Sequence, residues 1–311
     1  MTPGRSGPLL ALLTVLGGSG TAQAFCRTRA CDPTTETCKV DDKGCGRTGR
    51  LLTWASSCVT FDVQQDGSPK WGISADAATS VLERAFARWQ GASCDHGQPS
   101  IKVGTYGPLD CGEPGYNPNT HNANSVTFLD DEWPYPGSID TYAYTWVHFD
   151  RTTGEILDAD IEINSADFAL ALDSSINGTD LESILTHEAG HFLGLGHPDP
   201  ALTDATMRGE WDGSGTSLRS LAPDDEAGIC DIYAPGRVAP TSCEPKNGFA
   251  SACNVPVTQA EPPSGGCSVS TAWGGPRTGS LGGVLTLLAG LVVLRARKRE
   301  SRTHQSNSGT A

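Results

Sequence analysis

Residues 187–197 read HEAGHFLGLGH and place three histidines and one glutamate at spacings that suit a single metal ion. If residues 180–193 are helical, His187 and His191 lie one turn apart on the same face and can offer two imidazole nitrogens to one ion. Glu188 projects about 100° further around that helix. There it can reach a water molecule on the ion without being a ligand. The spacing therefore predicts a metal site with a carboxylate beside it.

The third ligand follows from a predicted helix stop. Gly194 can adopt a left-handed backbone, so the chain turns back and brings His197 toward the same point. A tetrahedral ion with three protein ligands keeps its fourth position open to water, unlike a closed structural zinc. We predict one catalytic Zn²⁺ bound by His187, His191 and His197, with Glu188 as general base and acid. A short HExxH alone can be a histidine pair on a solvated helix, but the longer pattern fixes five positions and favours the metal.

The metal motif carries a family resemblance. HExxHxxGxxH followed by a methionine turn is the metzincin pattern, and LESILTHEAGHFLGLGHPD resembles the matrixin branch, the matrix-metalloprotease-like peptidases. The turn corresponds to residues 205–207, where Met207 would pack as a structural floor beneath the imidazoles. The resemblance implies a zinc endopeptidase that acts on extracellular or cell-surface proteins through a metal-activated water.

The same resemblance implies a fold of the α+β class, a metzincin or zincin-like domain. It has a twisted, mostly parallel five-stranded sheet with an antiparallel edge strand, an active-site helix and a C-terminal helix. In that arrangement residues 143–149 form the edge strand. Its unpaired backbone groups line the cleft, so an extended peptide substrate can add as another strand.

Periodicity in the remainder of the domain agrees with this fold. Apolar residues recur with a period of 3.6 after Ser74, which can cap a helix that ends at Gly91. Runs rich in β-formers lie at 59–63, 101–103, 126–129, 143–149 and 156–163. The turn at 151–154 suggests that the last two form an antiparallel hairpin.

Two patterns next to the metal motif predict how its flanking helices begin. Thr179 and Glu182 are spaced as a capping box at the start of the active-site helix. Residues 223–233 look like the last matrixin helix, with acidic residues in the first turn that favour the helix dipole. In the family an aspartate here also braces the methionine turn, although simple capping by Asp224 explains most of the pattern.

The N-terminal residues predict that the protein is exported. The 311 residues, 37% of them hydrophobic, suffice for one core. Residues 1–24 carry a basic residue, an apolar run and a small-residue end, which is typical of a secretory signal. We assign residues 25–50 to a Cys-rich N-terminal segment, 51–235 to the matrixin-like domain and 236–266 to a Pro/Ser/Gly-rich linker.

Residues 267–311 predict a sorting or anchor tail. Cys267 precedes an apolar run over 281–294, expected to be a short helix, and then a basic cluster. This order resembles the MYXO-CTERM tail of delta-proteobacterial surface proteins, in which processing near the cysteine replaces the helix with an anchor. A retained single membrane span is the alternative. Both versions place the protein at the cell surface, anchored there or released after processing.

Export makes the 11 cysteines candidates for disulfide bonds, and setting Cys267 aside leaves an even number. A zinc cluster among the first five cysteines is a weaker alternative. Cys45 lies in a Cys-Gly-Arg segment that differs from the matrixin switch sequence, so we do not expect it to block the zinc. Connectivity cannot be read from sequence, and our expected pairs are Cys94 with Cys111 and Cys243 with Cys253.

Further metals and partners have little support in the sequence. Animal matrixins carry a structural zinc and calcium cage in the hairpin, but we assign no such ligands here and expect His148 to be a surface or packing residue. Ca²⁺ is possible but no EF-hand motif is present. The net charge of −14 disfavours nucleic acid. We expect a monomer that binds protein or peptide substrates. The alternative is a surface zinc-binding adhesion or binding module without turnover, which Glu188 disfavours.

Overall fold

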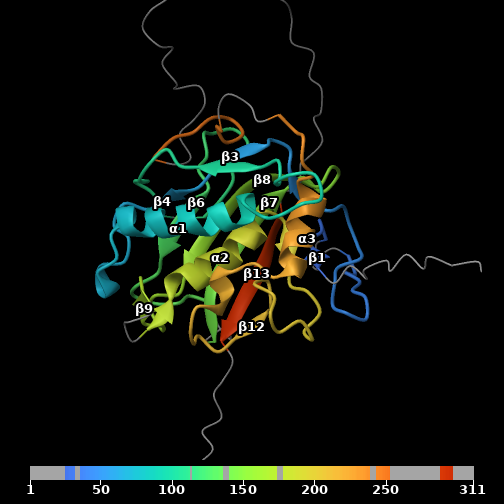
Figure 1. Cartoon of the computed structure of the whole chain (residues 1–311). Coiled ribbons are helices and arrows are strands. Elements are labelled where there is room, and N and C mark those ends of the chain that lie inside the picture. The colour runs from blue at the N-terminus through green and yellow to red at the C-terminus, as the bar shows by residue number, and fades with distance from the viewer. Residues whose placement is uncertain are drawn as a thin grey trace, which may run out of the picture.

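The computed structural model describes residues 25–31, 36–112, 114–135, 140–173, 178–238, 243–252 and 288–296 (Figure 1). The expected signal at 1–24, Cys267 and most of the expected linker and tail lie outside these residues. Within the described ranges, no helix is both long enough and apolar enough to cross a membrane.

Five strand positions form the sheet that the sequence predicts. Their order across the sheet is β5 (Lys102–Gly104), β3 (Cys58–Thr60) with β4 (Asp62–Val63), β6 (Ser125–Phe128), β8 (Glu155–Ile163) and β7 (Thr141–Phe149). Phe61 alone separates β3 from β4, so these two short strands act as one. All pairings are parallel except that of β7 with β8. The mostly parallel five-stranded sheet with an antiparallel outer strand is therefore confirmed.

The β7–β8 hairpin is the longest paired segment of this sheet. Its two strands of nine residues each are joined by a turn in which Gly154 has a φ of 81°, a left-handed conformation that favours glycine. A further strand, β2 (Thr53–Trp54), pairs in parallel with the first residues of β8. The antiparallel hairpin predicted from the two β-prone runs is confirmed.

The outer edge of β7 is not free in the structure. Strand β13 (Leu288–Ala296) pairs antiparallel with β7 over most of its length, and β12 (Glu210–Trp211) pairs in parallel with the end of β13 (Figure 1). The expectation of an apolar helix is thus wrong for residues 288–294, and so is the expectation of an unpaired edge. An exposed strand edge is a template for pairing, and the β-branched pair Val292 and Val293 favours an extended backbone.

Helices α1 (Ala75–Gln90) and α2 (Leu181–Phe192) lie on the same face of the sheet (Figure 1). Helix α1 begins at the expected cap, where the Ser74 side chain accepts a hydrogen bond from the Ala77 amide, and it ends at Gly91. Its buried face packs on α2 and the sheet through aromatic rings, with Phe86 stacked on Phe61 and edge-to-face with Phe192. Helix α2 is buried along its whole length.

Shorter elements complete the fold around these layers. They are β1 (Cys26–Arg27), η1 (Pro69–Trp71), β9 (Leu170–Ala171), β10 (Thr179–Asp180), β11 (Leu195–Gly196), η2 (Ser217–Arg219) and α3 (Pro223–Ile232). Strand β1 pairs with β11, and β9 pairs with β10.

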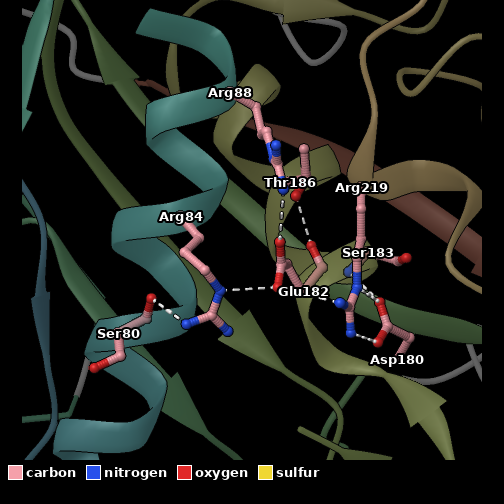
Figure 2. Close-up of polar contacts among 8 residues, drawn as sticks. All are labelled: Ser80, Arg84, Arg88, Asp180, Glu182, Ser183, Thr186 and Arg219. Carbon is pink, nitrogen blue, oxygen red and sulfur yellow. Dashed lines mark hydrogen bonds and ion pairs between the residues drawn. The ribbon is translucent and has the colours of Figure 1, made fainter. Parts of the chain in front are cut away.

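Helix α2 begins differently from the predicted capping box. Asp180, not Thr179, is the N-cap, and its carboxylate accepts a hydrogen bond of 2.8 Å from the Ser183 amide. Arg219 of η2 donates to the same carboxylate. Glu182 does not turn back to the helix start, because it pairs with arginines instead (Figure 2).

These contacts form a charged network that holds α1, α2 and η2 together. The Glu182 side chain is 3% exposed and lies 3.0 Å from Nε of Arg84, 3.7 Å from Nη2 of Arg88 and 3.5 Å from Nη1 of Arg219. Figure 2 shows the two α1 arginines reaching across to Glu182. Several cations around a nearly buried carboxylate offset the free-energy cost of removing it from water. The network fixes the start of α2 relative to its neighbours.

The disulfide bonds among the described residues join distant parts of the chain. They are Cys26–Cys45, Cys31–Cys38, Cys58–Cys243 and Cys94–Cys230. The expected partners of Cys94 and Cys243 were therefore wrong, because the fold brings residues together that lie far apart in sequence. Cys111 is also disulfide-bonded. The bond from Cys58 fastens residues 243–252, part of the expected linker, to the body of the domain.

Candidate metal centre

Helix α2 supplies two of the three predicted ligands. His187 and His191 lie one turn apart and are fully buried, and their ring centroids are 4.7 Å apart. The helix ends as predicted, because Gly194 has a φ of 97°. A side chain at residue 194 would also bring a Cβ atom to 2.9 Å from the Leu52 carbonyl oxygen. Glycine is therefore required where the chain turns toward His197.

The turn brings all three histidines to one point. Nε2 of His197 lies 3.1 Å from Nε2 of His187 and 3.0 Å from Nε2 of His191. Donor atoms in a tetrahedral zinc site are about 3.3 Å apart when each Zn–N distance is about 2.05 Å. The two distances to Nε2 of His197 are thus close to the separation that one bound zinc ion requires, and the donor atoms of all three residues lie within 4.8 Å of one another.

Backbone carbonyls orient the two helical imidazoles. Nδ1 of His187 lies 2.7 Å from the Thr206 carbonyl oxygen, and Nδ1 of His191 lies 2.9 Å from that of Leu195. A carbonyl only accepts, so each Nδ1 carries the proton and each Nε2 presents a lone pair. Lone pairs directed at a common point repel one another unless a cation lies between them. The donor set therefore fits Zn²⁺, which neutral imidazole nitrogens bind well.

Burial sets the charge state of these groups. Desolvation lowers the pKa of His187 and His191 well below the usual range for histidine, so both rings are neutral at pH 7. Desolvation also raises the pKa of Glu188 to about 8, with the Thr145 hydrogen bond acting in the opposite direction. A cation on the three imidazoles favours the ionised carboxylate of Glu188.

Glu188 lies beside the imidazoles and has two different oxygen atoms. Oε2 accepts a hydrogen bond of 2.5 Å from the Thr145 hydroxyl of β7. Oε1 is buried and has no hydrogen-bond partner among the described residues. One oxygen is therefore held by the protein, and the other is available to a water molecule or a substrate.

Met207, which the resemblance implies as a structural residue, is buried in the turn after His197. The backbone amides of Thr206 and Met207 both donate to the carboxylate of Asp225 in α3, at 2.7 and 3.1 Å. The expectation that Asp224 caps this helix is wrong, because Asp225 accepts from the amide of Ala222, the N-cap residue. Asp225 thereby fixes the turn whose carbonyl orients His187.

A second group of possible metal ligands lies on the hairpin. His148 of β7 and Asp158 and Asp160 of β8 have donor atoms within 4.8 Å of one another. Nδ1 of His148 is 3.4 Å from a carboxylate oxygen of Asp158, and burial raises the pKa of Asp158 to about 7. The expectation that His148 is only a surface or packing residue does not describe this arrangement.

Several residues that shape the centre carried no signal in the sequence. Thr145 is one of two threonines in β7, and Gly190 lies in a variable position of the motif. The indole N–H of Trp89 donates a hydrogen bond of 2.8 Å to the Thr186 carbonyl oxygen of α2. Each acts through the packing of distant segments, and only the three-dimensional fold shows it.

Comparison with known proteins gives a consistent result. The family model Peptidase_M10, described as Matrixin, matches residues 53–234. Metalloendoproteinase 1-MMP of Arabidopsis thaliana is 26% identical over 197 residues, which cover 58% of this chain and 44% of that relative. The chain thus matches less than half the length of this curated relative.

Proposed function

This chain belongs to the matrixin family, and from this premise we propose that it is a zinc-dependent endopeptidase. Its substrates in this proposal are extracellular or cell-surface proteins, bound as extended chains. The observation that carries the proposal is the convergence of three imidazole Nε2 atoms next to a buried glutamate with one unpartnered oxygen.

The chemistry divides between the metal and Glu188. Zinc bound to His187, His191 and His197 would lower the pKa of a water molecule and polarise the scissile carbonyl. Glu188 would take a proton from the attacking water through Oε1 and then donate it to the leaving amine. Its burial keeps competing solvent away from that oxygen. Glu188 is therefore the residue whose loss should stop turnover while the metal ligands stay in place.

Substrate binding in this proposal uses the outer edge of β7. An extended peptide would form backbone hydrogen bonds there as an added strand. Strand β13 has this position in the structure, so a substrate has to displace it. Residues 288–296 of the tail would then regulate the access of substrates to the outer edge of β7.

We also propose export to the cell surface and action as a monomer with one catalytic zinc. The four disulfide bonds among the described residues support an oxidising compartment, where such bonds persist. Anchoring through the tail beyond Cys267 would require β13 to leave the edge of β7, because residues 288–296 cannot pair with the sheet and lie in an anchor at the same time. Calcium has no support beyond the acidic composition.

The test is cleavage of an unfolded protein by the full chain and by Glu188→Gln, with zinc measured in both. We expect cleavage only by the unaltered chain and about one zinc in each protein. Glutamine keeps the volume of the side chain and its bond from Thr145, so folding should not differ. If neither protein cleaves although both bind zinc, the alternative of a zinc-binding adhesion module would replace this proposal.

A further inference from the structure

The middle of β7 places one hydroxyl group against the glutamate of the metal centre. Side chains alternate along a strand, so Ala143, Thr145 and Val147 share one face of β7, and all three are buried. The neighbours Tyr144 and Trp146 belong instead to an aromatic cluster with Tyr135. Thr145 is thus a polar residue between two apolar ones on the face that meets α2.

The contact between Thr145 and Glu188 is specific in its geometry. Oγ1 of Thr145 lies 2.5 Å from Oε2 of Glu188, which is within the range for a hydroxyl bonded to a carboxylate. The same hydroxyl oxygen is 3.5 Å from the Glu188 backbone carbonyl, a much longer separation. A hydroxyl has one proton to donate, and the shorter contact is with the side chain.

Two strand pairings make Thr145 a rigid support. Thr145 is paired with Ile161 of β8 on one side and with Val292 of β13 on the other, and it lies in the middle of β7. A threonine in a strand has restricted χ1 freedom because it is β-branched. The hydroxyl therefore has a fixed position, and it limits rotation of the glutamate carboxylate about its last torsion angle.

We propose that Thr145 is a positioning residue that holds Oε2 of Glu188 and so directs Oε1 toward the water and the leaving group. This role rests on the proposed peptidase function and adds a residue to it. Without the hydroxyl, the carboxylate can rotate and its proton transfer loses alignment. Binding of the metal and of the peptide should change little, because Thr145 is not a zinc ligand and the backbone of β7 is unaltered.

The test compares Thr145→Val, Thr145→Ser and Thr141→Val in the full chain. Valine keeps the shape and the strand preference of threonine but removes the hydroxyl, whereas serine keeps the hydroxyl. Thr141 is the matched control, because it is buried in the same strand and its Oγ1 has no hydrogen-bond partner among the described residues.

We expect Thr145→Val to lower kcat by about ten- to a hundredfold, the effect of losing a hydrogen bond to a charged group. KM, zinc content and Tm should stay near those of the unaltered chain. Thr145→Ser should recover most of kcat, and Thr141→Val should leave it unchanged.

Unchanged kcat in Thr145→Val would overturn this role and leave the peptidase function standing. The role would also be overturned if Thr145→Ser lost as much kcat as Thr145→Val, or if Thr141→Val showed the same loss. No cleavage by the unaltered chain would overturn the proposed function and this role together.

Discussion

Met207 packs so closely under Gly190 that a Cβ atom at residue 190 would lie 2.1 Å from the Met207 Sδ atom. The same Cβ atom would be 2.8 Å from Cζ2 of Trp89. The glycine in the middle of α2 is thus needed for the Met207 sulfur to lie against this helix.

Replacing Gly190 by alanine should therefore damage the metal centre. Alanine favours helix by about 1 kcal/mol over glycine, but the clash forces the Met turn away and costs about 2 kcal/mol or more in net stability. We expect a lower free energy of unfolding in urea and a substoichiometric zinc content. Gly196→Ala is the control, because its Cβ atom would be 3.6 Å from the nearest atom, an ordinary contact. Equal zinc in both variants would contradict the prediction.

Asp225→Asn should also weaken the site, because Asp225 holds the backbone of the turn that contains Met207. Both carboxylate oxygens accept backbone amides, and an asparagine NH₂ group would face one of those donors. We expect a loss of about 1 to 3 kcal/mol in the free energy of unfolding, with weaker zinc binding in a competition assay against a chelator. Asp224→Asn, one residue earlier in α3, should have little effect because an oxygen of Asp224 is buried without a hydrogen-bond partner among the described residues. A larger loss of stability and zinc affinity in Asp224→Asn than in Asp225→Asn would contradict this prediction.

Removing residues 267–311 should raise the rate of peptide cleavage. Strand β13 covers the edge of β7 that an extended substrate would use, so its removal leaves that edge free. If β13 covers the edge nine-tenths of the time, kcat/KM should rise on the order of tenfold. Glu188→Ala in the shortened chain serves as the blank. Equal rates for the full and shortened chains would show that β13 does not restrict access.

The stability of the domain should depend on pH through Asp62. Oδ1 of this buried carboxylate accepts bonds from the loop at residues 105–107, but Oδ2 has no hydrogen-bond partner among the described residues. Burial raises the pKa of Asp62 to about 6. The raised pKa means that the folded state binds this proton more tightly than the unfolded state, in which the pKa is about 3.9. The contribution to stability is fully present below pH of about 4 and is lost as the pH rises through about 6.

Urea unfolding of Asp62→Asn between pH 4 and 7 measures this contribution. Asparagine is neutral throughout, so the variant should lack a decrease of up to about 3 kcal/mol that the unaltered chain shows across this range. The exposed Asp66→Asn serves as the control and should behave as the unaltered chain. Parallel curves for all three proteins would contradict the assignment of the effect to Asp62.

The convergence of the three histidines could be predicted from sequence because their geometry is local. A four-residue spacing on one helix fixes His187 against His191, and the glycine three residues later fixes the turn that leads to His197. The strands could be predicted from runs of β-forming residues. Helix α1 could be predicted from its 3.6-residue apolar period and from its ends at Ser74 and Gly91. These features depend on residues that are close together in the sequence, so a short sequence motif is enough to predict them.

The start of α2 shows where local patterns fail. Thr179 and Glu182 match the capping-box pattern. In the structure, however, Asp180 forms an ion pair with Arg219, and Glu182 forms ion pairs with two arginines of α1. Those partners lie about 40 or 100 residues away, so no local pattern contains them. The disulfide partners of Cys58 and Cys94 and the contact of Thr145 with Glu188 were out of reach for the same reason.

Strand β1 carries a consequence for the order in which the protein folds. Arg27 pairs with Leu195, and the Thr28 hydroxyl donates to the Leu195 carbonyl, the same oxygen that orients His191. The first described residues of the chain thus close the loop that carries the last zinc ligand. Contacts between such distant segments form slowly, because a long loop must close first. Full metal affinity should therefore arise only after β11 has been synthesised and β1 has paired with it.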